Sequence, residues 1–178
     1  ENWIRFVGLG IIGVALFYVW MIDSGLLETL CEKFQINTMD RINFYTWLTN
    51  YFDFQLTYPG MGFGVSTKLM LLENTWGIYF GTSSVHSEIL RLFAELGMIG
   101  SIAFIGYYLV AIPQILKKQF NANIMYIYFS LQVYLFILHF TDNTLVYFTT
   151  QFVFTTLIVW GGLYKEIFSK KEMKETLV

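Results

Sequence analysis

The hydrophobic pattern of the chain is dominated by four long apolar runs, and most polar residues lie between or after them. The runs are Trp3–Ile22, Leu96–Leu116, Ile124–Phe140 and Leu145–Leu163. A helix needs about 20 apolar residues to cross the hydrocarbon core of a membrane, and the third run is the shortest of the four. The pattern therefore predicts an all-α fold, a polytopic bundle of about four transmembrane helices.

Composition agrees with a membrane environment. The chain is 56% hydrophobic and 13% charged, whereas soluble domains carry about 25% charged residues. A net charge of -2, without a basic run that interleaves aromatics, argues against a nucleic-acid partner. Cys31 is the single cysteine, which excludes an internal disulfide and a cysteine-based metal cluster. No cofactor and no metal site are expected.

The basic residues predict the orientation, because short loops rich in Lys and Arg stay in the cytoplasm. The residues that decide it are Arg5, Lys117, Lys118, Lys165, Lys170, Lys171 and Lys174. Placing them inside leaves a long loop over 23–95 and the turn Thr141–Thr144 on the extracytoplasmic side, with a cytoplasmic tail over 164–178. We treat 1–178 as a single transmembrane domain. Because the chain enters a span directly after Glu1, we expect further helices upstream.

The long loop is too rich in aromatics to be disordered by composition, and a connection of this length is usually functional. Gly25–Phe34 and Arg41–Tyr51 each have one apolar face, which predicts two short helices lying flat in the membrane interface. Gly60, Gly62 and Gly64 permit unusual backbone angles and close approach of a ligand. An ordinary turn is the alternative for this glycine run.

A helix is predicted after the glycine run, capped by Ser83 or Ser84, with His86 in its first turn. At about 100° per residue, one face of this helix is polar and the opposite face carries His86 in line with small residues. The polar face consists of Glu88, Arg91 and Glu95, and the small residues are Gly97, Gly100 and Ser101. Because small residues mark close packing in membranes, we expect His86 to point into the protein.

The order of these residues resembles the characteristic segment of the O-antigen ligase and polymerase family. The match runs Arg41-x5-Trp47, Gly60-x-Gly62-x-Gly64 and His86-x3-Leu90-x4-Glu95-x-Gly97-x2-Gly100, within residues 40–113. The family commonly has Asn after the His, where this chain has Ser87. That departure concerns the local hydrogen bonds and leaves the interpretation of the His unchanged.

The resemblance implies a GT-C-like inverting glycosyltransferase of the bacterial cytoplasmic membrane, multi-pass, with its active face outside. The donor would be a glycan on undecaprenyl diphosphate, and the acceptor another lipid-linked glycan or a lipid core. The family's important arginine and histidine correspond to Arg41 and His86, which makes these two the implied catalytic residues. Further implied partners are membrane lipid, chain-length regulators and flippase proteins.

The chemistry suits these residue types. The leaving lipid diphosphate gains charge in the transition state, and positioned cations stabilise such charge. The guanidinium of Arg41 can bind phosphate through a planar fork. The acceptor hydroxyl loses a proton, and histidine is a side chain suited to accept it, which is the role considered for His86. A metal-independent mechanism is favoured.

Each candidate has a structural alternative. Arg41 can be an interfacial anchor for lipid phosphates, and His86 a structural histidine. Arg91 is a candidate for substrate binding, although a salt-bridged helix face with its neighbouring glutamates is favoured. His139 and Asp142 follow the third span on the same side as His86, and ionisable groups there are functional candidates. Structural roles for both stay open.

Polymerisation of lipid-linked repeats, for capsule, exopolysaccharide or O-antigen, is the favoured function. A ligase that transfers a finished glycan is the close alternative. A non-catalytic transporter subunit would require interrupted helices and charges near the bilayer midplane, and the charges here lie at the boundary. A structural subunit would leave the order of the loop residues unexplained.

Overall fold

The computed structural model describes residues 2–39, 41–75, 85–142 and 161, and within them the regular elements are all helical. They are α1 (Asn2–Asp23), α2 (Leu26–Lys33), α3 (Arg41–Leu48), η1 (Thr49–Tyr51), α4 (Val65–Thr75), α5 (Glu88–Gly106), η2 (Tyr107–Ala111), α6 (Ile112–Gln119) and α7 (Ala122–His139). The predicted all-α class is therefore confirmed for this part of the chain.

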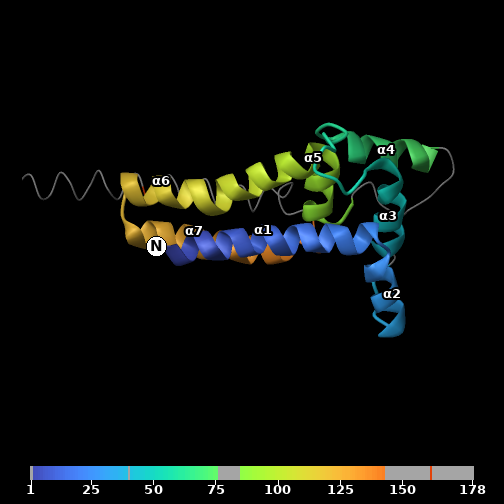
Figure 1. Cartoon of the computed structure of the whole chain (residues 1–178), viewed down its shortest axis with the longest axis horizontal. Helices are drawn as coiled ribbons and strands as arrows, with labels where there is room; N and C mark the ends of the chain where they lie inside the picture. Colours follow the sequence, from blue (N-terminus) through green and yellow to red (C-terminus); the bar gives the residue numbers. More distant parts are fainter. Residues whose placement is uncertain (1, 40, 76–84, 143–160, 162–178) are drawn as a thin grey trace, which may run out of the picture.

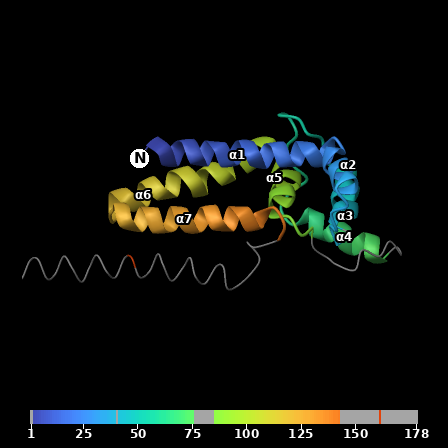
Figure 2. The same ribbon diagram turned by 90° about the horizontal axis from the view of Figure 1, so that it is seen from below.

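Three apolar helical segments, each long enough to cross a membrane, form a bundle. They are α1, the stretch Glu88–Gln119 that comprises α5, η2 and α6, and α7. Figures 1 and 2 show α1, α6 and α7 side by side along the long axis, with the later part of α5 continuing into α6. The first and third predicted spans agree closely with α1 and α7. The fourth, Leu145–Leu163, lies outside the described residues except for Gly161.

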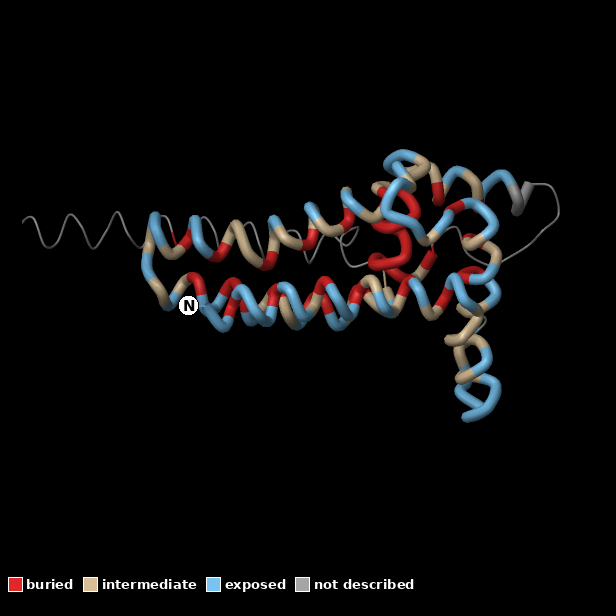
Figure 3. Tube along the Cα trace, viewed as in Figure 1, coloured by how far each residue is buried: buried red, intermediate tan, exposed pale blue. Residues whose placement is uncertain are grey.

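The bundle is apolar inside and outside. On α1, Ile12, Ala15 and Val19 recur at helical spacing and are buried, whereas Phe6 and Val14 on other faces of the same helix are exposed (Figure 3). In water an exposed face of this kind would be polar. A bundle that exposes large apolar side chains along membrane-length helices is consistent with a membrane protein.

The second predicted span differs from the expected continuous helix, because α5 breaks at Gly97. Gly97 has φ 71° and ψ −179°, which is far from helical geometry. The part of α5 before the break runs across the end of the bundle, and the part after it runs along the bundle (Figures 1 and 2). The part of this span that runs along the bundle therefore begins after Gly97. The expectation that His86, Gly97 and Gly100 share one straight helix face was wrong.

Farther along this span, the helix accommodates a proline without ending. Pro113 lies in the first turn of α6, directly after the π-helical turn Tyr107–Ala111. Proline lacks an N–H and its ring clashes with the carbonyl four residues earlier. The helix widens directly before the proline, where the Ile112 amide donates to the carbonyl of Tyr107 five residues earlier.

The long loop folds over one end of the bundle, which we call the loop end: the last turn of α1, helix α3, the first turns of α5 and the C-terminus of α7. Gly25, at φ 73°, turns the chain so that α2 projects away from the bundle instead of continuing α1 (Figure 1). Both predicted short helices are present, as α2 and as α3 with η1.

The two short helices differ in their surroundings. Helix α2 has no fully buried residue, as expected of a helix at an interface. Helix α3 instead buries Phe44, Tyr45 and Leu48 in the protein core. The apolar face of α3 therefore packs on protein, and a position of α3 in the membrane interface stays a prediction.

Candidate active site at the loop end of the bundle

The segment His86–Glu88 is fixed from two sides. The hydroxyl of Tyr45, on α3, donates to the carbonyl of His86 at 3.0 Å. From the other side, Ser87 Oγ donates to the carbonyl of His139 at 3.5 Å, and the Glu88 amide donates to the carbonyl of Asp142 at 3.2 Å. The start of α5 is thus held between α3 and the C-terminus of α7.

The cap of α5 is Ser87 and not Ser83 or Ser84, which lie outside the described residues. Ser87 has extended backbone angles, and its Oγ accepts the amide of Leu90 at 3.3 Å. His86 precedes the cap with φ 52°, so it lies before the helix and not in its first turn. Serine and asparagine are both strong N-caps. The serine after the histidine therefore supplies the same kind of hydrogen bond that an asparagine would.

Arg41 begins α3 and is half-buried. Tyr45 follows one turn later, so the two side chains share a face of the helix. Burial raises the pKa of the Tyr45 hydroxyl, the nearby Tyr18 adds to the rise, and the positive charge of Arg41 opposes it. The phenol therefore remains protonated and available as a donor to His86. Tyr45 thus lies beside both implied catalytic residues, Arg41 and His86.

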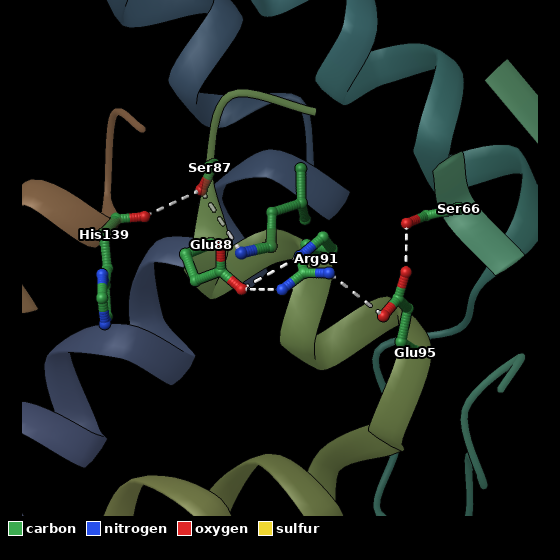
Figure 4. A network of polar contacts seen from close by, with 7 residues as sticks. Ser66, Ser87, Glu88, Arg91, Glu95 and His139 are labelled. Carbon is green, nitrogen blue, oxygen red and sulfur yellow. Dashed lines mark hydrogen bonds and ion pairs between the residues drawn. The ribbon is translucent and has the colours of Figure 1, made fainter. Parts of the chain in front are cut away.

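Arg91 lies in a buried ionic cluster, which Figure 4 shows. Its Nε donates to Glu88 Oε1 at 3.0 Å, its Nη2 donates to the same oxygen, and its Nη1 lies 3.7 Å from Glu95 Oε2. Ser66 Oγ on α4 donates to Glu95 Oε1, and the ring of Phe63 lies 5.5 Å from the guanidinium. The expected pairing along the polar face is present.

This polar face points into the protein and not toward solvent. Glu88 is 0% exposed, Glu95 2% and Arg91 8%. The single guanidinium lies between the two carboxylates and offsets part of their negative charge, which isolated buried carboxylates would lack. The donors of Arg91 are directed at the two glutamates. The contacts therefore favour the salt-bridge interpretation of Arg91, and substrate binding by this residue stays a prediction.

Removing Arg91 is expected to destabilise the fold. Arg91→Met would leave two buried carboxylates uncompensated, a change that typically costs about 3–5 kcal/mol. The matched control is Lys68→Met, because Lys68 is an exposed cation on α4. The measurement is the thermal midpoint of each purified variant in detergent. Equal midpoints for the two variants would contradict a stabilising role for the cluster.

The glycine run caps the end of the first part of α5. The amides of Met61 and Gly62 donate to the carbonyls of Ala94 and Glu95 at 2.9 and 3.0 Å, and Tyr58 Oη donates to the carbonyl of Ala94 at 2.7 Å. These donors satisfy carbonyls that a helix leaves unpaired at its C-terminus.

All three predicted glycines have the expected unusual backbone. Gly60, Gly62 and Gly64 have φ of 85°, 102° and 77°. Gly60 packs against the backbone around Gly97, so that a Cβ on Gly60 would lie 2.3 Å from the Glu95 carbonyl oxygen. Gly64 borders open space, with nothing within 4 Å of an added Cβ. Gly60 and Gly62 thus serve the end of the first part of α5, and a role of the three glycines in lining a ligand site stays a prediction.

His139 and Asp142 lie at the loop end, close to His86, as the sequence predicted. Their carbonyls receive the hydrogen bonds from Ser87 and Glu88 described above. The side chain of His139 is buried and packs against the ring of Phe136, with 5.0 Å between ring centroids. The structure therefore brings both residues to the site through their backbone, and substrate binding by their side chains stays a prediction.

Two residues of the site were not among the sequence candidates, Tyr45 and Ser87. A signal for Tyr45 existed, since it lies four residues after Arg41 and such spacing places two side chains together on a helix. For Ser87 the sequence signal was ambiguous, because several serines precede α5 and any of them could cap the helix. Within the described residues, no group of three or more His, Cys, Asp or Glu side chains lies close enough to hold a metal ion.

Comparison of the chain with protein-family models, curated proteins and solved structures finds no match. The described part is therefore placed in a broad class: an all-helical protein with three membrane-length apolar helices and a cluster of polar and ionisable residues at one end.

Proposed function

We propose that the protein is a membrane glycosyltransferase of the O-antigen ligase and polymerase type, acting on oligosaccharides carried by undecaprenyl diphosphate. One observation carries the proposal: Arg41 and His86, far apart in the sequence, both lie near Tyr45 at the loop end of the bundle, Arg41 one turn before it on α3 and His86 through a backbone hydrogen bond from its hydroxyl. A cation for a diphosphate and a titratable base are the two groups that this transfer requires, and the motif order in the sequence supports the same assignment.

The proposed reaction is a single inverting displacement. The acceptor hydroxyl attacks the anomeric carbon, and the bond from that carbon to the diphosphate oxygen breaks with its electron pair leaving on the lipid diphosphate. The imidazole of His86 takes the proton of the acceptor hydroxyl. The guanidinium of Arg41 pairs with the diphosphate oxygens as their charge grows. The new glycosidic bond has the opposite anomeric configuration.

The surroundings suit a substrate whose lipid tail remains in the bilayer. Phe17 and Trp20, on the part of α1 nearest the loop end, are exposed and stack on each other at 5.5 Å. A polyprenyl chain can lie along such an apolar face while its diphosphate reaches the loop end. We place the protein in the bacterial cytoplasmic membrane with this end outside, where it would receive repeats delivered by a flippase.

The test is a transfer assay with the complete protein encoded by the gene, purified and placed in liposomes. Lipid-linked repeat units serve as donor and acceptor, and gel electrophoresis resolves glycan length. A ladder of longer glycans is expected, and a chelator should leave it unchanged. A single transfer to an added lipid core, without a ladder, would indicate a ligase. No product with either acceptor would contradict the proposal, and loss of product to the chelator with rescue by a divalent ion would contradict the metal-independent mechanism.

A further inference from the structure

The hydroxyl of Tyr45 makes a contact that nothing in the sequence motif accounts for. It donates to the backbone carbonyl of His86 at 3.0 Å. Tyr45 is 4% exposed and belongs to the hydrophobic core, so packing on its own helix and on the bundle holds its ring in place. The donor is therefore rigid, and it acts on the backbone of His86.

The backbone that receives this hydrogen bond is strained. His86 has φ 52°, a left-handed conformation that residues with a side chain seldom adopt and that persists only where neighbours enforce it. Ser87 and Glu88 hold the following residues against α7. Tyr45 holds His86 itself from α3.

The same phenol lies one helical turn after Arg41, whose charge acts on it. The hydrogen bond from Tyr45 therefore ties the backbone of His86 to α3, the helix that begins with Arg41. Displacement of a reacting group by about 1 Å can cost 10²-fold in rate. The position of His86 relative to α3 therefore matters to a transfer that uses both His86 and Arg41.

We infer that Tyr45 is a positioning residue: its hydroxyl holds His86 in the left-handed conformation and anchors the backbone of His86 to the helix that begins with Arg41. The catalytic consequence rests on the proposed function. The conformational consequence does not, because it concerns only the backbone of His86.

The test variant is Tyr45→Phe in the complete protein, which deletes the hydroxyl and keeps the ring. Tyr58→Phe is the matched control, because it deletes a phenol that donates to a different backbone carbonyl, that of Ala94 in α5 at 2.7 Å. We expect Tyr45→Phe to lower kcat about 10-fold to 100-fold, with the KM for the lipid-linked donor changed less than about 2-fold. Tyr58→Phe is expected to leave kcat within about 2-fold.

A double-mutant cycle separates positioning from general stabilisation. In a His86→Ala background, Tyr45→Phe should have almost no further effect on kcat, because the group that it positions is gone. Additive losses, or equal losses for Tyr45→Phe and Tyr58→Phe, would overturn the inference.

A second readout needs no enzymatic activity. Diethyl pyrocarbonate modifies histidine, and peptide mass spectrometry reports the rate at His86 separately from that at the buried His139. Tyr45→Phe should change the His86 rate several-fold, and Tyr58→Phe should not. A changed rate in a protein that shows no transferase activity would mean that the proposed function fails and the positioning role stands. An unchanged rate would overturn the positioning role whatever the activity.

Discussion

Gly97→Ala is expected to prevent the complete protein from accumulating in folded form. Gly97 has φ 71° and ψ −179°, a region occupied essentially by glycine alone. An added Cβ would lie 2.1 Å from the carbonyl oxygen of Tyr58 and 2.8 Å from the carbonyl carbon of Pro59. Both atoms belong to the backbone of the loop that caps α5, so neither can move aside by changing a rotamer. We expect destabilisation above about 4 kcal/mol, the range reserved for severe steric or burial defects.

The measurement is the amount and thermal midpoint of monodisperse protein after extraction in detergent. Gly13→Ala is the matched control, because Gly13 lies within α1 and nothing stands within 4 Å of an added Cβ. Alanine there should be neutral or stabilising by up to about 1 kcal/mol. Gly60→Ala should resemble Gly97→Ala, since the two glycines pack against each other's backbone. If Gly97→Ala behaved like Gly13→Ala, the break in α5 would be placed wrongly.

The sequence predicted the elements whose signal is carried by hydropathy and length. The first and third apolar runs became α1 and α7 with ends that shift by only a few residues. The short helices were predicted for a similar reason, since helical spacing of leucine and aromatic residues can be read from one segment alone. In each case the deciding information is local.

The break at Gly97 could not be predicted in the same way. Apolar residues lie on both sides of Gly97, so the hydropathy pattern does not reveal a change of backbone direction there. A glycine in such a run normally indicates close helix packing. What decides the break is the loop around Gly60, whose backbone lies against Gly97 and whose amides cap the preceding carbonyls. That contact joins distant segments, and a single sequence does not reveal it.

The site was predicted in part for the same reason. The motif selected His86 and Arg41, and hydropathy put His139 and Asp142 at the same end. The sequence could not show that Arg91 is buried, because charged residues are usually exposed unless they are paired. Here the contact from another element is made to Glu95, which pairs with Arg91 and accepts a hydrogen bond from Ser66 on α4.

In the complete protein, His86→Ala and Arg41→Ala are each expected to lower the rate of glycan transfer by about 10²–10³, the usual effect of removing one group that stabilises charge in a transition state. Both residues are half-buried and lie outside the hydrophobic core, so the variants should insert and purify as the unchanged protein does. The measurement is the initial rate of glycan lengthening on lipid-linked repeats at equal protein amounts.

The size of the loss is interpretable only against matched variants. Arg5→Ala is the control for Arg41→Ala, because Arg5 is an exposed arginine on α1 that contacts Gln114 on α6, away from the loop end. It should retain a normal rate. Arg41→Lys should restore only part of the activity, since lysine keeps the charge and loses the planar fork that holds two phosphate oxygens. Full activity in Arg41→Lys would show that Arg41 acts as a simple point charge. Near-normal glycan length from His86→Ala would remove His86 from the reaction, and the base would then have to come from another group at the loop end.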